Sequence, residues 1–411
     1  MTVPLDLDFV RAQFPAFAEP TLKGQAHFEN AGGSYACGQV IDRLHRYYCA
    51  TKVQPYHPFP AAAEAGAQMD AAYTALARYL NVDVDEVHIG PSTTQNTYVL
   101  ARAMATGLLV PGDELIVTNQ DHEANGGSWR RLAERGVVVR EWRVDAQTGE
   151  LDPAELDDLM TERTRLLCFP HCSNIVAHVN PVAAICARAR AAGVATVVDG
   201  VSYAGHGLPD VDALGCDVYL FSLYKVYGPH QGVMAVRRGF AERLDNQSHF
   251  FNAGETRKRL VPAGPDHAQV AASAGVAAYF DALDAHHGGA DDDGRPARVR
   301  ALLHAAETRL LGGLLDAVTR VPGLRLLGPG DAARRAPTVS LATPGRDPVA
   351  LARALGERGV MCAGGHFYSY RTVEALGLDP SEGVLRLSFV HYTSDAEVDQ
   401  AIAALDAVMH A

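Results

Sequence analysis

Lysine is scarce in this sequence, and this scarcity limits where an amine can act as a nucleophile. The 411 residues contain four lysines, at positions 23, 52, 225 and 258. Lys225 follows DVYLFS at 217–222, a short apolar run typical of a buried strand. A lysine amine can form a Schiff base with a carbonyl compound, so Lys225 is the candidate for that chemistry.

Polar side chains also follow four other predicted strands. They are Thr93 and Thr94 after EVHIG (86–90), His122 after ELIVTN (114–119), Asn174 after RLLCFP (165–170), and Asp199 and Ser202 after ATVV (195–198). The carboxyl ends of parallel strands meet at one edge of a sheet, where ligands bind, so we expect these side chains to converge.

Together these residue types match the needs of a phosphate-bearing aromatic aldehyde. Such a cofactor takes a lysine for its Schiff base and a carboxylate for its pyridinium nitrogen. Thr94 at a helix N-terminus, with Ser222, could bind the phosphate, and the ring of His122 could stack on the cofactor. Lys225 and Asp199 supply the amine and the carboxylate.

Each of these residues has a simpler explanation when it is taken singly. Thr93 and Thr94 could be helix caps, and Lys225 could be a surface lysine. The segment CFPHC at 168–172 resembles a metal site, but its middle lies on a predicted buried strand, and structural zinc sites usually need four spaced ligands. The sequence therefore favours no metal, and it has no GxGxxG at GHGLPD to indicate a dinucleotide.

The elements that would position these residues alternate between strands and helices. Strands are predicted at 86–90, 114–119, 137–144, 165–171, 195–200 and 217–222, with an antiparallel edge strand at 233–238. Helices are predicted at 39–50, 61–80, 93–104, near 124–135, around ELDDLM (155–160) and at 181–193. Short apolar runs that alternate with helices indicate a parallel sheet covered on both faces.

A polar, glycine-rich segment at 286–296 predicts a domain boundary. After it we expect a smaller α+β unit with a long helix after Arg295, strands at 324–328, 338–343 and 384–390, and a final helix. Ser394 and Glu397 have the spacing of a capping box at the start of that final helix. We therefore expect an N-terminal segment at 1–30, a large cofactor-binding domain at 31–290 and a small domain at 291–411.

Composition narrows the class of protein further. The net charge is −12, from 36 basic and 48 acidic residues, which disfavours a nucleic-acid surface. The sequence has no apolar run of about 20 residues and no signal-peptide pattern at its start. Seven cysteines without a framework pattern suit a reducing cytoplasm, where we expect the protein.

Six segments, in order, resemble the class V aminotransferase family of pyridoxal-phosphate enzymes, in its cysteine desulfurase and selenocysteine lyase branch. The resemblance runs from FENAGG near residue 28 to the final helix. The segments are STTQN (92–96), DHEAN (121–125), HCSNIVAHVNP (171–181), VVDGVS (197–202), SLYKVYGPHQG (222–232) and VLRLSF (384–389).

The resemblance implies a role for one residue or more in each segment. It implies phosphate binding by Thr94 and Ser222, ring stacking by His122, a contact of Asn174 with the phenolic oxygen, pairing of Asp199 with the pyridine nitrogen, the Schiff base on Lys225, and binding of the substrate carboxylate by Arg386.

The resemblance also implies the overall architecture. It implies fold type I, with a mostly parallel, seven-stranded-type sheet and a smaller α+β domain. It further implies a homodimer in which VPAGPDH (261–267) places Gly264 to His267 near the partner's phosphate site.

The departures from the family pattern concern the reaction. Ser202 stands where the family often has Gln, and Tyr224 where it has His. In GGHFYSY (364–370), Tyr368 stands where desulfurases of the branch carry a nucleophilic Cys, and Cys362 lies six residues earlier on a predicted strand. A persulfide mechanism needs a mobile thiolate.

We therefore expect β-elimination at a carbon–sulfur bond of a small amino acid, without a persulfide. An aminotransferase, an amino-acid epimerase and a catalytically inactive regulatory protein that binds the cofactor are the alternatives. Asn30, His57, His366 and Tyr368 are candidates to shape the substrate pocket beside Arg386.

Overall fold

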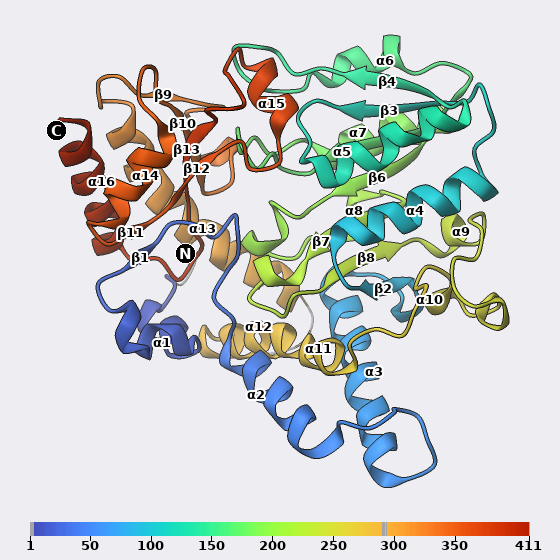
Figure 1. The fold of residues 1–411 in the computed structure, drawn as a ribbon. Coiled ribbons are helices and arrows are strands. Elements are labelled where there is room, and N and C mark those ends of the chain that lie inside the picture. Colours follow the sequence, from blue (N-terminus) through green and yellow to red (C-terminus); the bar gives the residue numbers. More distant parts are fainter. Residues whose placement is uncertain (1–3, 290–291, 293, 411) are drawn as a thin grey trace.

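The computed structural model describes residues 4–289, 292 and 294–410. Its centre is a seven-stranded sheet in the order β2-β8-β7-β6-β5-β3-β4 (Figure 1). The strands are β2 (Val87–Gly90), β3 (Glu114–Thr118), β4 (Val138–Trp142), β5 (Thr164–Pro170), β6 (Ala195–Asp199), β7 (Val218–Ser222) and β8 (Gly232–Val236). The predicted α/β fold with a seven-stranded, mostly parallel sheet is confirmed.

Strand β8 is antiparallel to both of its neighbours, β7 and β2, and the other neighbouring pairs are parallel. The antiparallel direction at 233–238 was predicted correctly, but the edge position was wrong. The short connection after β7 returns the chain beside β7, and β2 then pairs with the outer side of β8. Consequently six of the seven strands end at the same edge of the sheet.

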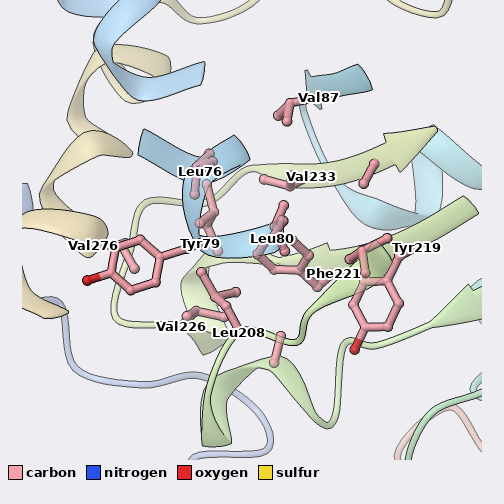
Figure 2. Close-up of a cluster of buried hydrophobic side chains, with 14 of the residues drawn as sticks. Leu76, Tyr79, Leu80, Val87, Leu208, Tyr219, Phe221, Val226, Val233 and Val276 are labelled. Carbon is pink, nitrogen blue, oxygen red and sulfur yellow. The ribbon is translucent and has the colours of Figure 1, made fainter. Parts of the chain in front are cut away.

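Side chains along the central strands alternate between two hydrophobic cores. Tyr219 and Phe221 of β7 belong to one core, and Val218 and Leu220 belong to the other. The first core packs on α3 (Pro60–Leu80), from which Leu76 and Leu80 point toward β7 and β8 (Figure 2). Burial on both faces explains why these strands read as continuous apolar runs.

Helices cover both faces of the sheet. The face of the first core is covered by α2 (Gly38–Arg46), α3, α7 (Val182–Ala191), α11 (His267–Ala272) and α12 (Ala274–His286). The opposite face is covered by α4 (Thr93–Gly107), α5 (Glu123–Arg130) and α9 (Arg238–Ala241). The helix predicted around ELDDLM is only the four-residue α6 (Leu156–Leu159). Further short helices are α8 (Val211–Leu214) and α10 (Thr256–Arg259).

The C-terminal part forms a second layered unit. Its antiparallel sheet has the order β12-β13-β10-β9, from Ala363–Gly365, Val384–Ser388, Thr338–Ala342 and Arg325–Leu326. The helices are α13 (Arg295–Val318), α14 (Pro348–Gly356), α15 (Tyr370–Ala375) and α16 (Asp395–Met409). The predicted capping box of Ser394 and Glu397 at the start of α16 is confirmed.

The N-terminal segment contacts both units. In α1 (Leu7–Ala12), Phe9 stacks on His286 of α12 with ring centroids 3.8 Å apart, and Arg11 pairs with Glu397 of α16. Strand β1 (Ala26–His27) pairs in parallel with β11 (Val360–Met361). The division into domains near 290 stays a prediction, and residues 290, 291 and 293 lie outside the described part.

Among the helices of the described residues, none is long and apolar enough to cross a membrane.

Gly232 at the start of β8 lets the turn before α4 approach closely. A Cβ atom on Gly232 would lie 2.3 Å from both the Ser92 carbonyl carbon and the Thr93 nitrogen. Gly232→Ala is therefore expected to lower the free energy of unfolding by roughly 1–3 kcal/mol, because backbone atoms must shift.

Urea unfolding followed by circular dichroism measures this change. Gly239→Ala is the matched control, since Gly239 is exposed in α9 and a Cβ atom added there would meet no heavy atom within 4 Å. Equal stabilities of the two variants would contradict the close approach.

Candidate active site

A cavity of about 300 Å³ opens at the carboxyl edge of the large sheet. Segments that follow β2, β3, β5, β6 and β7 supply its walls, as expected for an open parallel sheet. The residues that line it are Ser92, Thr93, Thr94, His122, Ala124, Pro170, Cys172, Asn174, Asp199, Val201, Ser202, Ser222, Tyr224, Lys225 and His230. The structure thus brings together all eight residues predicted to bind the cofactor.

Lys225 lies in the single turn that follows β7, and 9% of its surface is exposed. Burial, together with the positive charge of Arg386, lowers the pKa of Lys225 to about 8, although Asp199 and Glu29 act in the opposite direction. A neutral amine is therefore accessible near physiological pH.

Asp199 ends β6, and its Oδ1 accepts a hydrogen bond of 2.9 Å from the Val201 nitrogen. Burial raises the pKa of Asp199 to about 6, against the opposing influence of Val201 and Lys225. Nearby, burial raises the pKa of Asp121 to about 7, and the charge of Asp199 adds to this rise. A cationic group placed against Asp199 would relieve this cost of burying its charge.

His122 forms the N-cap of α5, where its Nδ1 accepts a hydrogen bond of 3.0 Å from the Ala124 nitrogen. Burial, followed by the charges of Lys225 and Arg386, lowers the pKa of His122 to about 3. The imidazole is therefore neutral at physiological pH, which suits stacking on an aromatic ring.

The part of the cavity formed by the start of α4 and by Ser222 has the groups that bind an anion. Ser92 caps α4, a 15-residue helix whose first N–H groups lack partners within the helix. The hydroxyls of Thr93 and Ser222 lie 2.7 Å apart, and Tyr224 stacks on His230 with ring centroids 4.8 Å apart. A helix N-terminus beside hydroxyl groups suits a phosphate.

Asn174 lines the cavity, but its side chain is held by the loop at 366–369. Its Nδ2 donates to the Phe367 oxygen at 3.0 Å, and its Oδ1 accepts from Ser369 Oγ at 2.6 Å. One N–H of the amide remains for the phenolic-oxygen contact that the resemblance implies.

Arg386 lies on β13 with 3% of its surface exposed, behind the residues that line the cavity. Its Nη1 donates to the backbone carbonyl oxygen of Asn174 at 3.3 Å, and its Nη2 donates to Glu29 Oε1 at 2.9 Å. The ring of Phe367 covers the guanidinium, with Cζ 3.6 Å from the ring centroid. Glu29 was not predicted as a site residue, although it stands inside the motif FENAGG, directly before Asn30.

The four other substrate candidates lie in different environments. Asn30 is buried, and its Oδ1 and Nδ2 bond to Tyr392 and to the oxygen of His27. His57 is exposed beside Phe59 and is not among the described residues that line the cavity. Asn30 also lines a small cavity together with Ser202 and Lys225, so its role in substrate binding stays a prediction, whereas His57 of this chain lies outside the residues that line the large cavity.

His366 and Tyr368 belong to the loop at 366–369, which contacts His122 but lies outside the residues that line the cavity. His366 Nδ1 accepts a hydrogen bond of 3.1 Å from the Tyr368 nitrogen. The Tyr368 ring centroid lies 5.3 Å from that of His122. The backbone carbonyl oxygen of Tyr368 accepts a hydrogen bond of 2.7 Å from the Glu123 nitrogen. Phe367 and Tyr368 both have positive φ angles, of 50° and 57°, a strained conformation for aromatic residues.

Exposed aromatic side chains gather on segments near Gly264–His267. Residues 264, 265 and 267 line a surface hollow together with Tyr56 and His249. Tyr48, Tyr56, Phe59, Phe250 and Phe251 are all exposed. Exposed apolar patches of this kind are typical of protein interfaces.

The cysteines offer no activated thiol in the cavity. Cys172 lines the cavity, but its Sγ donates to the Ala177 oxygen at 3.2 Å, and burial raises the pKa of Cys172 to about 12. Burial also raises the pKa of Cys362 to about 12. Cys49 is exposed, outside the lining residues.

The donor set fits pyridoxal 5'-phosphate. A buried amine, a carboxylate, a neutral imidazole and a hydroxyl-bearing helix N-terminus surround one cavity, and each matches one part of that cofactor. Fold and site together define a pyridoxal-phosphate-dependent enzyme of fold type I.

Comparison with known proteins identifies the family. The model of aminotransferase class-V matches residues 26–263 and 299–401, so the chain belongs to the class V aminotransferase family. It is 36% identical to an aminotransferase-like protein of Gibberella zeae, covering 98% of both chains. It is 30% identical to a cysteine desulfurase of Pectobacterium carotovorum, covering 99% of this chain and 98% of that one.

A solved cysteine desulfurase from Thermococcus onnurineus has the same fold. Its TM-score is 0.86 at 19% identity, covering 100% of this chain and 99% of that chain. The predicted family and its cofactor, pyridoxal 5'-phosphate, are confirmed.

The titration of Lys225 predicts how the cofactor attaches. The neutral amine reacts with an aldehyde, so attachment to the apoprotein is expected to speed up as the pH rises through about 8 and to level off above that pKa. Absorbance spectroscopy measures the rate.

Borohydride reduction and peptide mapping locate the attachment. The label is expected on Lys225, whereas Lys258 is exposed and paired with Glu255 at 2.7 Å. A label on Lys23, Lys52 or Lys258 instead would contradict the assignment.

Proposed function

We propose that this enzyme is a β-elimination lyase that cleaves a carbon–sulfur bond in a small amino acid, without a persulfide cysteine. The observation that carries the proposal is the pairing of a complete cofactor set with Tyr368, rather than a thiol, in the loop over His122. The family membership supports the cofactor chemistry, and the loop supports the outcome.

The cofactor would be held by residues of the cavity. Lys225 would bind its aldehyde carbon, Asp199 its ring nitrogen, and Thr93, Thr94 and Ser222 its phosphate. Held there, pyridoxal phosphate supplies an electron-withdrawing ring that stabilises negative charge at the substrate's Cα. His122 would stack on that ring, and Asn174 and Ser202 would lie beside it.

Lys225 would move the proton at Cα. With a substrate amine in its place on the cofactor, Lys225 Nζ would be a free base, and only 9% of the Lys225 surface is exposed. The electron pair of the Cα–H bond becomes the Cα–Cβ double bond, while the pair of the Cβ–S bond leaves with sulfur, which takes up a proton. Water converts the released enamine into a 2-keto acid and ammonia.

The cysteine environments support elimination over sulfur transfer to the protein. A thiolate that attacks a substrate sulfur must be mobile and deprotonated at working pH. Cys172 and Cys362 are held near the site as thiols by burial, which raises the pKa of each to about 12.

An aminotransferase is the second candidate, because the relative from Gibberella zeae is described as aminotransferase-like. An epimerase would share the same proton removal by Lys225. The completeness of the cofactor set argues against an inactive regulatory protein.

We further propose a homodimer through the exposed aromatic surface near Gly264–His267, and a cytoplasmic location.

Asp199→Asn is expected to lower kcat on the order of 10²-fold, because the carboxylate that keeps the ring nitrogen protonated is lost. Steady-state assays at matched cofactor occupancy measure this. Asp379→Asn is the control, since the Asp379 side chain accepts hydrogen bonds from Ser381 in an exposed turn. Turnover of Asp199→Asn near the wild-type value would show that the nitrogen partner lies elsewhere.

A single-donor incubation separates the reaction outcomes. With a β-substituted amino acid and no keto-acid acceptor, a lyase is expected to release keto acid and ammonia over many turnovers. An aminotransferase would stop after one turnover with its cofactor in the amine form. Product assays and the absorbance spectrum distinguish the two, and a protein persulfide formed from cysteine would refute the argument from Tyr368.

A further inference from the structure

Arg386 is already bound to a carboxylate of its own chain. Glu29 Oε1 lies 2.9 Å from Arg386 Nη2, and Nη1 is bound to the Asn174 oxygen. The Phe367 ring covers one face of the guanidinium. The residue expected to bind the substrate's carboxylate therefore holds an internal carboxylate in the ligand-free chain.

Glu29 is held in place by the turn that follows it. Its Oε2 accepts a hydrogen bond of 2.7 Å from the Gly32 nitrogen. A Cβ atom on Gly32 would lie 2.4 Å from that oxygen, so this side-chain position requires a glycine at 32. The contact is thus a built feature of the motif FENAGG.

One donor of the guanidinium is left over. Arg386 Nε is buried and has no hydrogen-bond partner among the described residues. A buried donor without an acceptor costs free energy, and a ligand oxygen would remove that cost. Nε together with Nη2 would give the two-bond fork that suits a carboxylate.

Glu29 is the partner that can move. Its side chain is 26% exposed, while that of Arg386 is 3% exposed and is fixed by Asn174 and Phe367. A rotation of the carboxylate could free Nη2 while Oε2 keeps its bond to Gly32.

We propose that Glu29 is a specificity-determining residue that occupies Arg386 and must be turned aside by the substrate's carboxylate. This inference rests on the proposed function and on the carboxylate-binding role that the family resemblance implies for Arg386. Two carboxylates beside one guanidinium repel each other, so the charge of Glu29 weakens the binding of every ligand that carries a carboxylate. Amines without a carboxylate escape this competition, so Glu29 sets how strongly the site discriminates between the two.

The test is calorimetric binding to the holoenzyme of L-alanine, which has no leaving group at Cβ, and of ethylamine, which lacks only its carboxylate. Glu29→Gln keeps an oxygen for the Gly32 nitrogen but removes the charge. It is expected to bind L-alanine on the order of tenfold more tightly and ethylamine unchanged. Glu19→Gln, at an exposed position, controls for net charge and should match the wild type.

The arms separate failure of the inference from failure of the proposed function. Arg386→Lys is expected to weaken L-alanine binding but not ethylamine binding. If it does so while Glu29→Gln leaves L-alanine unchanged, or shifts both ligands equally, the inference about Glu29 is overturned alone. If Arg386→Lys changes neither ligand, the carboxylate-binding role of Arg386 is wrong and the inference falls with it, whereas failure of the proposed function would show in the single-donor incubation.

A structural measurement on the wild type avoids dependence on variant folding. A crystal structure of the holoenzyme with L-alanine is expected to show Glu29 Oε1 displaced from Arg386 Nη2. An unchanged pair beside a carboxylate bound elsewhere would overturn the inference.

Discussion

The active site depends on four charged groups that come together at the carboxyl edge of the large sheet, three of them buried and the fourth, Glu29, partly exposed. Lys225 and Arg386 are cations, and Asp199 and Glu29 are anions that oppose them. Charges taken out of water are tolerated only when they are paired and hydrogen-bonded. Burial lowers the pKa of Lys225 to about 8 and raises that of Asp199 to about 6, and the attraction between the two groups limits both shifts. The site is therefore primed for groups that carry complementary charge.

The two units of the chain supply different parts of this balance. The large sheet places Lys225 and Asp199 at the ends of neighbouring parallel strands, β7 and β6. Arg386 comes from β13 of the second sheet, and Glu29 joins it from the N-terminal segment. Substrate binding would thus act where the parts of the chain meet.

The loop at 366–369 connects these parts physically. The Phe367 ring covers the Arg386 guanidinium, and the Ser369 hydroxyl donates to Asn174 Oδ1. The backbone carbonyl of Tyr368 accepts a hydrogen bond from the Glu123 nitrogen. The positive φ angles of Phe367 and Tyr368 show that the loop holds a costly conformation, which the surrounding contacts maintain. In the proposed function, Tyr368 of this loop stands where a persulfide cysteine would take the sulfur of the substrate.

The sequence by itself determined the large sheet and the cofactor side of the site. Strands buried on both faces are continuous apolar runs, and the polar residues that follow them must meet at one edge, so Lys225, Asp199 and His122 could be found without coordinates. The position of β8 inside the sheet could not be found, because strand order depends on pairing between distant segments rather than on local pattern.

Only the tertiary structure decided what surrounds the substrate end. Glu29 and Arg386 are separated by 357 residues, and no local pattern shows that they pair. The side chain of Asn30 bonds to Tyr392 and to the His27 carbonyl oxygen, and His57 is exposed beside Phe59. Contacts between residues far apart in the sequence depend on how one unit packs on another. The free energy of that packing comes from many segments together, so no single segment predicts it.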